Sequence, residues 1–369
     1  MDETYAGAPR DAVEMELCGI WRSVLNRPAV NVNDNFFLDL GGSSLECVNI
    51  ISAAGQAFGV SLRLTDFYLA PTLGAMAAQI RSGTSRTARG PVVQIQAGQG
   101  GEPVYVFHPL AGTVLCYVEL ARAMGPRHPL RGLQSEGLEP GSTPLTSIDA
   151  MADHYVAHMR TAHPSGPVPW NLIGYSMGGC LAVEVARRLN AQGERVRLVG
   201  LIDTDAPLGS EILSVDTIRE NAIRGIARHY LHVDVDINEF RHQTTEEKLR
   251  ELHSRGVAAE TLPVDYNLDI LRRLVAVHIH NRLAIGSYCP DSYKGALTLF
   301  RASPPDAASG VASEREDLRL GWSRIADTFH VHDIPCDHFS IMDMPAVAQI
   351  AQAIYSYLEG QAPSRLLPS

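Results

Sequence analysis

The sequence has 369 residues with a formal net charge of −10, and 45% of its residues are hydrophobic. A prior of about one domain per 150 residues predicts two folded domains, and the acidic excess argues against nucleic-acid binding, which needs a Lys/Arg-rich face. No apolar run approaches the roughly 18 residues of a membrane span, so no membrane segment is expected. Six cysteines lack metal-ligand spacing and the H-E-x-x-H motif is absent, which indicates reduced thiols, a cytoplasmic location and no metal site.

Residues 1–81 are expected to form a small helical domain. Apolar residues recur at helical spacing in two stretches, and Thr72 after Pro71 can cap a last helix that ends near Ile80. The two apolar faces consist of Val13, Leu17, Ile20, Trp21 and Val24, and of Leu45, Val48, Ile51 and Phe58. Residues 82–99 are expected to be a linker, because their first ten residues are small and polar with two glycines.

Residues 100–369 predict an α/β domain, because short apolar runs alternate with helical stretches. The expected strands are Val104–His108, Leu130–Gln134, Leu172–Tyr175, Arg197–Asp203, Ala296–Arg301 and Phe329–Ile334. The expected helices between them are Leu115–Ala123, Ile148–Ala162, Met177–Gln192 and Ala346–Leu358. From about 206 to 290 two helical stretches replace the strand pattern, 214–231 and 268–285. We expect this insertion to be a lid over a site at the carboxyl ends of the strands.

Ser176 lies in Gly-Tyr-Ser-Met-Gly, the G-x-S-x-G frame of a sharp turn between a strand and a helix. A side chain in place of Gly174 or Gly178 would crowd such a turn. The residues before Ser176 have a strand pattern and those after it repeat at helical spacing, which favours a nucleophile over a glycine-rich packing turn. A serine hydroxyl is a weak nucleophile, so a base, an acid that orients the base and donors for an oxyanion should accompany it.

In this class of fold the partners follow in the chain order serine, acid, histidine. Asp203 ends an apolar strand and is the expected acid, with Asp205 as the alternative. His338 lies in a predicted loop between the last strand and the last helix and is the expected base. His330 and His332 are the alternatives within the strand itself.

The oxyanion donors are expected to be two backbone N–H groups. One is the N–H of Met177, and the other comes from the loop after the first core strand, where we expect Leu110. His108, at the end of that strand, could be a further base, but its place beside Pro109 favours a role in fixing the loop.

Ser44 follows Leu-Gly-Gly-Ser at the start of a predicted helix. A serine at this position can be a helix cap, and so can Ser43. The same position suits a phosphodiester, because the first N–H groups of a helix and its dipole favour negative charge. This geometry does not choose between Ser43 and Ser44.

Residues 10–81 resemble a peptidyl carrier domain of nonribosomal peptide synthetases, a small four-helix fold. The resemblance is carried by Asp34-Asn35-Phe36-Phe37 and by Leu40-Gly41-Gly42-Ser43-Ser44-Leu45. It implies that 4′-phosphopantetheine is attached to Ser44, the serine directly before the leucine. Ser43 departs from the family, which more often has histidine or aspartate at that position.

Residues 100–360 resemble the type I thioesterase domain of the same synthetases, an α/β hydrolase with a helical lid. The matching segments are Phe107-His108-Pro109, Gly174-Tyr175-Ser176-Met177-Gly178-Gly179, Leu201-Ile202-Asp203 and Asp337-His338-Phe339. The resemblance implies a catalytic triad of Ser176, Asp203 and His338.

Together the two resemblances imply that a peptidyl or acyl thioester held on Ser44 is released through an acyl-enzyme on Ser176, by hydrolysis or macrocyclisation. The implied partners are upstream condensation and adenylation domains, a phosphopantetheinyl transferase and the peptidyl thioester substrate. Two alternatives stay open. One is a carrier fused to a binding or editing domain that releases nothing, and the other is an ordinary esterase whose helical domain only mediates interactions.

Overall fold

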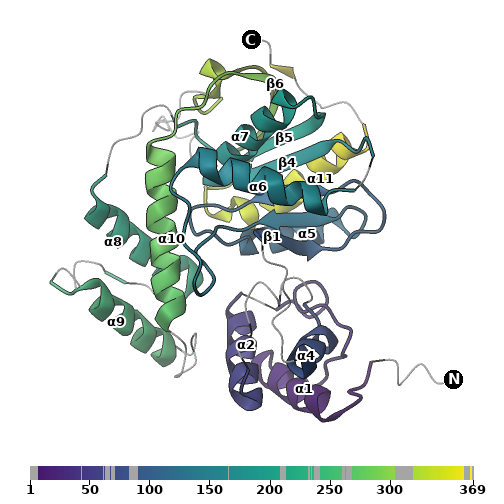
Figure 1. The fold of residues 1–369 in the computed structure, drawn as a ribbon, viewed down its shortest axis with the longest axis vertical. Coiled ribbons are helices and arrows are strands. Elements are labelled where there is room, and N and C mark those ends of the chain that lie inside the picture. The colour runs from purple at the N-terminus through teal and green to yellow at the C-terminus, as the bar shows by residue number, and fades with distance from the viewer. Residues whose placement is uncertain are drawn as a thin grey trace. The chain divides into compact units, whose positions relative to one another are not determined.

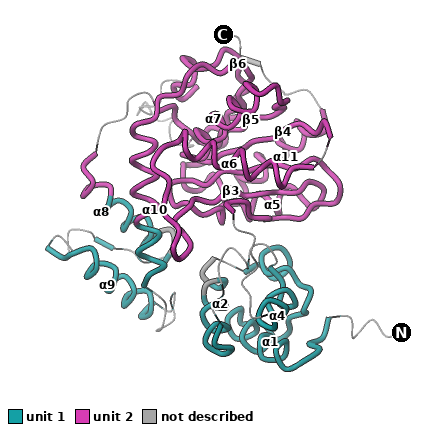
Figure 2. Tube along the Cα trace, in the orientation of Figure 1, with its two compact units in different colours: residues 1–89, 219–275 teal, residues 90–218, 276–369 magenta. Residues whose placement is uncertain are grey.

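The computed structural model describes residues 7–42, 44–60, 62, 67, 71–82, 90–164, 166–207, 213–231, 233, 235–236, 242–259, 262, 268–303, 319–360 and 366–367. The chain divides into two compact units (Figure 2). The first comprises residues 1–89 and 219–275, and the second comprises residues 90–218 and 276–369.

The N-terminal part of the first unit is helical in its described elements, which are α1 (Ala12–Val24), α2 (Ser44–Phe58) and α4 (Leu73–Ser82) (Figure 1). The Asp11 side chain caps α1 by accepting a hydrogen bond from the N–H of Glu14 at 2.9 Å. Thr72 caps α4, as expected, since its hydroxyl accepts from the N–H of Ala75. The buried Glu14 carboxylate joins α1 to α4 through Arg81 at 2.8 Å. The fourth helix implied for this domain lies outside the described residues.

An aromatic cluster fills the core of this helical domain. The Trp21 and Phe36 rings meet edge to face with centroids 5.4 Å apart, and Phe36 meets Phe67 in the same way at 5.0 Å. Such pairs add roughly 0.5–1.5 kcal/mol each to the stabilisation from burial alone. Phe36 therefore fixes the loop that precedes α2 to the helical core.

The second unit contains an eight-stranded sheet with the strand order β1-β3-β2-β4-β5-β6-β7-β8. Strands β2 to β7 pair in parallel, and only the edge strands β1 and β8 are antiparallel to their neighbours. The strands are β1 (Val92–Gln96), β2 (Val104–Phe107), β3 (Leu130–Leu133), β4 (Trp170–Tyr175), β5 (Val196–Ile202), β6 (Tyr293–Ala302), β7 (Ala326–Ile334) and β8 (Leu366–Leu367). The expected α/β fold is thus confirmed.

Helices cover both faces of this sheet. Those of one layer are α6 (Ile148–Ala162) and α7 (Met177–Ala191), and those of the other are α5 (Val118–Met124) and α11 (Ala346–Leu358) (Figure 1). All six residues of β4 are buried, as expected for a parallel strand covered on both sides.

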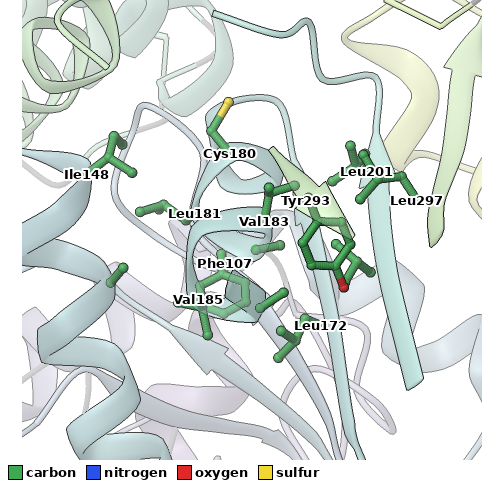
Figure 3. Packing of buried hydrophobic residues seen from close by; sticks show 14 of the residues in the cluster. Phe107, Ile148, Leu172, Cys180, Leu181, Val183, Val185, Leu201, Tyr293 and Leu297 are labelled. Carbon is green, nitrogen blue, oxygen red and sulfur yellow. The ribbon is translucent and has the colours of Figure 1, made fainter. Parts of the chain in front are cut away.

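The main hydrophobic cluster lies between the strands and the α6–α7 layer. Figure 3 shows its members side by side; those labelled include Phe107, Leu172, Leu181, Val185, Leu201 and Leu297. This packing fixes the start of α7, and with it Ser176, to the ends of the central strands.

Two differences from the sequence-based expectation concern β1 and helix α9 (Thr245–Ala258). The expected linker 82–99 contains β1, which pairs with β3, so the sheet domain begins before residue 100. The polar Gln94 and Gln96 in β1 interrupt the continuous apolar run that is typical of the inner strands of this sheet. Helix α9 was not expected because few of its residues are apolar, although the Thr244 and Glu247 side chains form a capping box at its start.

The expected lid, about 206–290, is helical in its described part. Its elements are α8 (Val215–Gly225), a π-helical turn over Ile226–Tyr230, α9 and α10 (Leu268–Gly286). Arg272 of α10 pairs with Glu246 of α9, and Lys248 of α9 pairs with Glu220 of α8 at 3.4 Å. Residues 219–275 fall in the first compact unit. That they cover the site stays a prediction.

Candidate active site and carrier attachment site

Ser176 lies at the sharp turn between β4 and α7. Its φ of 54° is in the left-handed region, which a non-glycine residue adopts only where its surroundings impose it. The Ser176 N–H donates to the carbonyl of Ile202 at 2.9 Å, and the Thr204 hydroxyl donates to the carbonyl of Ser176 at 2.9 Å. The turn is therefore held from the neighbouring strand β5, and its serine side chain is only partly buried.

The glycines of the motif allow backbones to approach closely. A Cβ on Gly174 would lie closer than 3.0 Å to the backbone of Gly178, and a Cβ on Gly178 would overlap the carbonyl of Phe107. A Cβ on Gly179 would lie closer than 3.0 Å to the side chain of Thr204. The spacing G-x-S-x-G-G thus reflects three contacts that any side chain would push apart.

Asp203 directly follows β5 and is 1% exposed. Tyr175 and Ile202 are paired in the β4–β5 ladder, so Ser176 and Asp203 come immediately after two adjacent strand ends. Asp203 Oδ2 accepts from His338 Nδ1 at 2.6 Å, and its Oδ1 accepts from the Ala302 N–H at 3.0 Å. The expected acid and base are therefore in contact.

The structure does not join Ser176 to His338 by a hydrogen bond among the described side chains, although each follows the carboxyl end of a strand in one sheet, β4 and β7 respectively. Hydrogen bonds between nucleophile and base are often long without substrate and shorten in the complex. Because Nδ1 of His338 donates to a carboxylate, its Nε2 is the ring nitrogen that can accept a proton.

The His338 loop is held by Tyr175 and Asp337, which lie in the matching segments but to which the sequence alone gives no role. The Tyr175 hydroxyl donates to the carbonyl of His338 at 2.8 Å, and the two rings lie 5.1 Å apart. Asp337 accepts from the N–H groups of Phe339 and Ser340, which lowers the pKa of the Asp337 carboxyl. No sequence pattern signals the Tyr175 contact, since it joins residues 163 positions apart.

The loop after β2 contains Leu110, the second expected oxyanion donor. The carbonyl of Pro109 accepts from His108 Nδ1 and from the Gly112 N–H, each at 2.9 Å. In a trans peptide the N–H points away from the carbonyl, so these two bonds set the direction of the Leu110 N–H. Met177 is the first residue of α7. The first N–H groups of a helix have no hydrogen-bond partner within the helix, so they can donate to other groups.

His108 acts as a fixed part of this loop. It is fully buried, and its Nε2 lies 2.7 Å from the Tyr155 hydroxyl. Burial lowers the pKa of His108 to about 4, so the ring is neutral, with Nδ1 donating to Pro109 and Nε2 accepting from Tyr155. This geometry supports the loop-fixing role over that of a further base.

The two alternative bases and the alternative acid have different surroundings from His338 and Asp203. His332 stacks on Phe300 with ring centroids 5.1 Å apart, and its Nε2 lies 3.3 Å from the Tyr357 hydroxyl. His330 lies two residues earlier in β7 beside the same Tyr357 ring. Asp205 is exposed, in contrast to the buried Asp203 that contacts His338.

Helix α2 begins at Ser44, so this serine is at a helix N-terminus, as the sequence predicts. Ser43 lies outside the described residues. The preceding loop is fixed by Asn35, whose side-chain oxygen accepts from the N–H groups of Phe37 and Leu38, both at 3.0 Å. The N–H of Gly42 donates to the carbonyl of Phe36 at 2.8 Å, and a Cβ on Gly42 would overlap the Phe36 ring.

Comparison with known proteins identifies the class of both parts. A thioesterase domain model matches residues 102–356, and a phosphopantetheine attachment site model matches residues 16–80. The chain therefore belongs to the thioesterase domain family. A phosphopantetheine-binding domain precedes the thioesterase domain, and members of this second family carry 4′-phosphopantetheine covalently. The expected carrier and thioesterase, in this order, are confirmed.

Similar proteins include nonribosomal peptide synthetases. A dimodular nonribosomal peptide synthase of Bacillus subtilis is 28% identical over 362 residues, which cover 95% of this chain and 14% of that protein. An indigoidine synthase of Dickeya dadantii is 35% identical over 203 residues, 54% of this chain and 13% of that protein. The chain thus spans about one seventh of the length of each of these two relatives.

Solved structures show the same two-part similarity. A four-domain nonribosomal peptide synthetase bound to AMP and glycine has a TM-score of 0.66 and 28% identity, covering 94% of this chain and 26% of that one. The Vlm2 thioesterase domain, at 23% identity, has a TM-score of 0.51 over 71% of this chain and 95% of its own, which shows a shared fold.

Among the described helices of this chain, none has the length and apolar character needed to cross a bilayer.

Proposed function

We propose that this chain releases a peptidyl or acyl group from a phosphopantetheine thioester on Ser44 through an acyl-enzyme on Ser176. The observation that carries the proposal is the contact between Asp203 and His338 at 2.6 Å, beside the strained turn that presents Ser176. A buried carboxylate that orients a histidine beside a partly buried strand-end serine is an arrangement suited to acyl transfer.

The residues around Ser44 suit a phosphodiester. Ser44 starts a helix of 15 residues, whose first N–H groups and dipole favour the negative charge of the phosphate. The close packing of Gly42 on Phe36 fixes the backbone that leads to Ser44. When bound, the phosphopantetheine arm supplies a terminal thiol that carries the acyl chain as a thioester.

In the proposed chemistry the Ser176 oxygen bonds to the thioester carbonyl carbon while its proton passes to Nε2 of His338. The N–H groups of Leu110 and Met177 stabilise the resulting oxyanion. The carbon–sulfur bond then breaks, and the thiol leaves with the proton from His338. Asp203 keeps Nδ1 of His338 protonated and stabilises the imidazolium.

Water or a nucleophile of the acyl chain then resolves the ester on Ser176. Water gives the linear acid, and an internal hydroxyl or amine gives a macrocycle. The lid helices α8, α9 and α10 are proposed to decide between them by limiting water entry. Upstream condensation and adenylation domains would supply the chain, and a phosphopantetheinyl transferase would modify Ser44.

The test uses the full chain and a soluble acyl-pantetheine thioester, with thiol release followed over time and products separated by mass. We expect Ser176→Ala to lower kcat by at least about 10³-fold. Ser147→Ala is the matched control, because Ser147 caps α6 and lies outside the proposed site. Equal rates for the wild type and Ser176→Ala would overturn the proposal, and rates no higher than the uncatalysed reaction in both would favour a carrier fused to a domain that releases nothing.

The choice of acid is tested in the same assay by the same substitution at two positions. Asp203→Asn is expected to lower kcat on the order of 10²- to 10⁴-fold, because the amide no longer fixes the His338 tautomer. Asp205→Asn is expected to leave kcat within about twofold, since exposed substitutions have small effects. The opposite order would assign the acid to Asp205.

A further inference from the structure

Asn281 contacts the loop that contains the proposed oxyanion donor. It is completely buried in α10, and its Nδ2 donates to the carbonyl of Leu110 at 3.0 Å. Its side-chain oxygen lies 3.4 Å from the Ser135 hydroxyl, which can donate to it. A buried amide with both ends in contact holds its carbonyl partner firmly, because a carbonyl left unpaired away from water is destabilising.

Leu110 lies between two peptide groups, and each is anchored through its carbonyl. The first, Pro109–Leu110, is held by His108 and Gly112. The second, Leu110–Ala111, is held by Asn281 alone among the contacts recorded for the described residues. Because only two torsion angles at Leu110 join these groups, the anchor on the Leu110–Ala111 group limits how far the group that contains the Leu110 N–H can turn.

Helix α10 also packs directly against the loop. Gly112 has a φ of +81°, and a Cβ there would overlap the Val277 side chain of α10. The Gly112 carbonyl accepts from the N–H of Ser135 at 2.9 Å. The loop is thus enclosed between the segment after β3 and the face of α10 that bears Val277 and Asn281.

We propose that Asn281 is a positioning residue for the oxyanion hole, which fixes the Leu110 N–H from helix α10. This inference rests on the proposed function, and it adds that a residue of the insertion, which touches no reacting atom, sets the rate of the chemical step. Loss of the Asn281 amide frees the Leu110–Ala111 peptide to rotate. The Leu110 N–H is then less well aligned with the oxyanion of the transition state. We therefore expect kcat to fall more than substrate binding weakens.

The first experiment measures loop order without any activity assay. Hydrogen exchange of the Gly112 amide, which donates to Pro109, is followed by mass spectrometry in the full chain. Asn281→Leu, which is similar in size but has no donor, is expected to raise the exchange rate at least about tenfold through local opening. Unchanged exchange at Gly112 would overturn the proposal.

The matched control is Asn171→Leu. Asn171 is also completely buried, and its Nδ2 donates to the carbonyl of Pro103 at 3.2 Å, but it lies near the opposite end of β4 from Ser176. It shares the loss of a buried amide without touching the Leu110 loop. An equal rise in Gly112 exchange in Asn171→Leu would assign the effect to general destabilisation and overturn the proposal.

The second experiment separates kcat from KM with the soluble thioester. Removing one oxyanion donor costs about 10²- to 10³-fold in kcat, so its displacement in Asn281→Leu is expected to cost about 10- to 100-fold with KM within about threefold. Asn171→Leu is expected to keep the wild-type kcat. A raised KM with unchanged kcat for Asn281→Leu would overturn the proposal.

A second variant allows the test to be made if Asn281→Leu does not fold. Asn281→Asp keeps the size and an oxygen for the Ser135 hydroxyl, but it replaces the donor to Leu110 with an acceptor. It is expected to show the same exchange and kcat changes as Asn281→Leu. If the wild type itself hydrolysed no thioester, the proposed function would fail, and Gly112 exchange would still decide whether Asn281 orders the loop.

Discussion

Ser176 and Asp203 have positive φ angles of 54° and 41°, in a region that costs non-glycine residues roughly 1–3 kcal/mol each. Both are held in it by backbone bonds, from Ser176 N–H to Ile202 and from Asp203 N–H to Phe300. The strain is therefore offset by the sheet that carries the two residues. It places a serine and a carboxylate at adjacent strand ends, where the acid contacts His338.

The low pKa of His108 predicts a pH dependence of stability. Its pKa is about 4 in the folded protein because of burial, against 6.5 ordinarily. Between these values the unfolded chain binds a proton on this residue and the folded chain does not. Stability from this residue is thus fully present above pH 6.5 and falls by about 3 kcal/mol as the pH decreases to 4.

Urea unfolding at pH 6.5 and at pH 4 measures this effect, with His108→Gln as the comparison. The half-buried His278 also contributes to the total, because desolvation lowers its pKa as well. The prediction therefore concerns the difference between the chains: His108→Gln should lose less stability over the interval than the wild type. An equal loss in both would contradict the neutral, buried state of His108.

At the scale of elements, the turn between β4 and α7 depends on close backbone contact between α7 and β2. Gly178→Ala is expected to destabilise the sheet domain by about 1–3 kcal/mol or more and to lower kcat on the order of 10²-fold, because its Cβ would meet the carbonyl of Phe107. The measurements are thermal unfolding and thioester hydrolysis.

Gly19→Ala in α1 provides the matched control. A Cβ at Gly19 meets nothing within 4 Å, so the helix propensity of alanine should stabilise α1 by about 1 kcal/mol, with kcat unchanged. If Gly178→Ala were tolerated as well as Gly19→Ala, the close approach of α7 to β2 would not be what holds Ser176.

The sequence allowed the buried elements near the site to be predicted, and the reasons are physical. Strands such as β4 are buried throughout and mostly apolar because both faces are covered, and α7 follows a turn whose glycines are required by contact. Edge strand β1 and helix α9 were missed because each buries few apolar residues. The contacts of Tyr175 and Asn281 could not be predicted, since they join segments far apart in the chain.

At the scale of the whole molecule, a carrier domain and a thioesterase domain occur in one chain, and each contains one of the two serines proposed to react. We expect the reactions of these two serines to be separable by substitution. Ser44→Ala should gain no mass when the full chain is treated with a phosphopantetheinyl transferase and coenzyme A. It should still hydrolyse a soluble acyl-pantetheine thioester within about twofold of the wild-type rate, because Ser44 takes no part in the proposed chemistry on Ser176 once the thioester is supplied in solution.

Intact-mass measurement and the soluble assay check this prediction together. Mass gain by Ser44→Ala would move the attachment site to another serine, with Ser43 the first candidate. A loss of soluble thioester hydrolysis in Ser44→Ala would mean that the two domains do not work as separate units in this reaction.

The most direct test of acyl transfer from Ser44 to Ser176 is a single-turnover experiment on the full chain loaded with an acyl-phosphopantetheine arm. Samples are quenched at successive times, digested, and the acyl group is located by mass spectrometry. In the wild type, acyl on the Ser44 peptide should fall while acyl on the Ser176 peptide rises and then decays with product. In Ser176→Ala the acyl group should stay on Ser44, and product release from that variant at the wild-type rate would contradict the account.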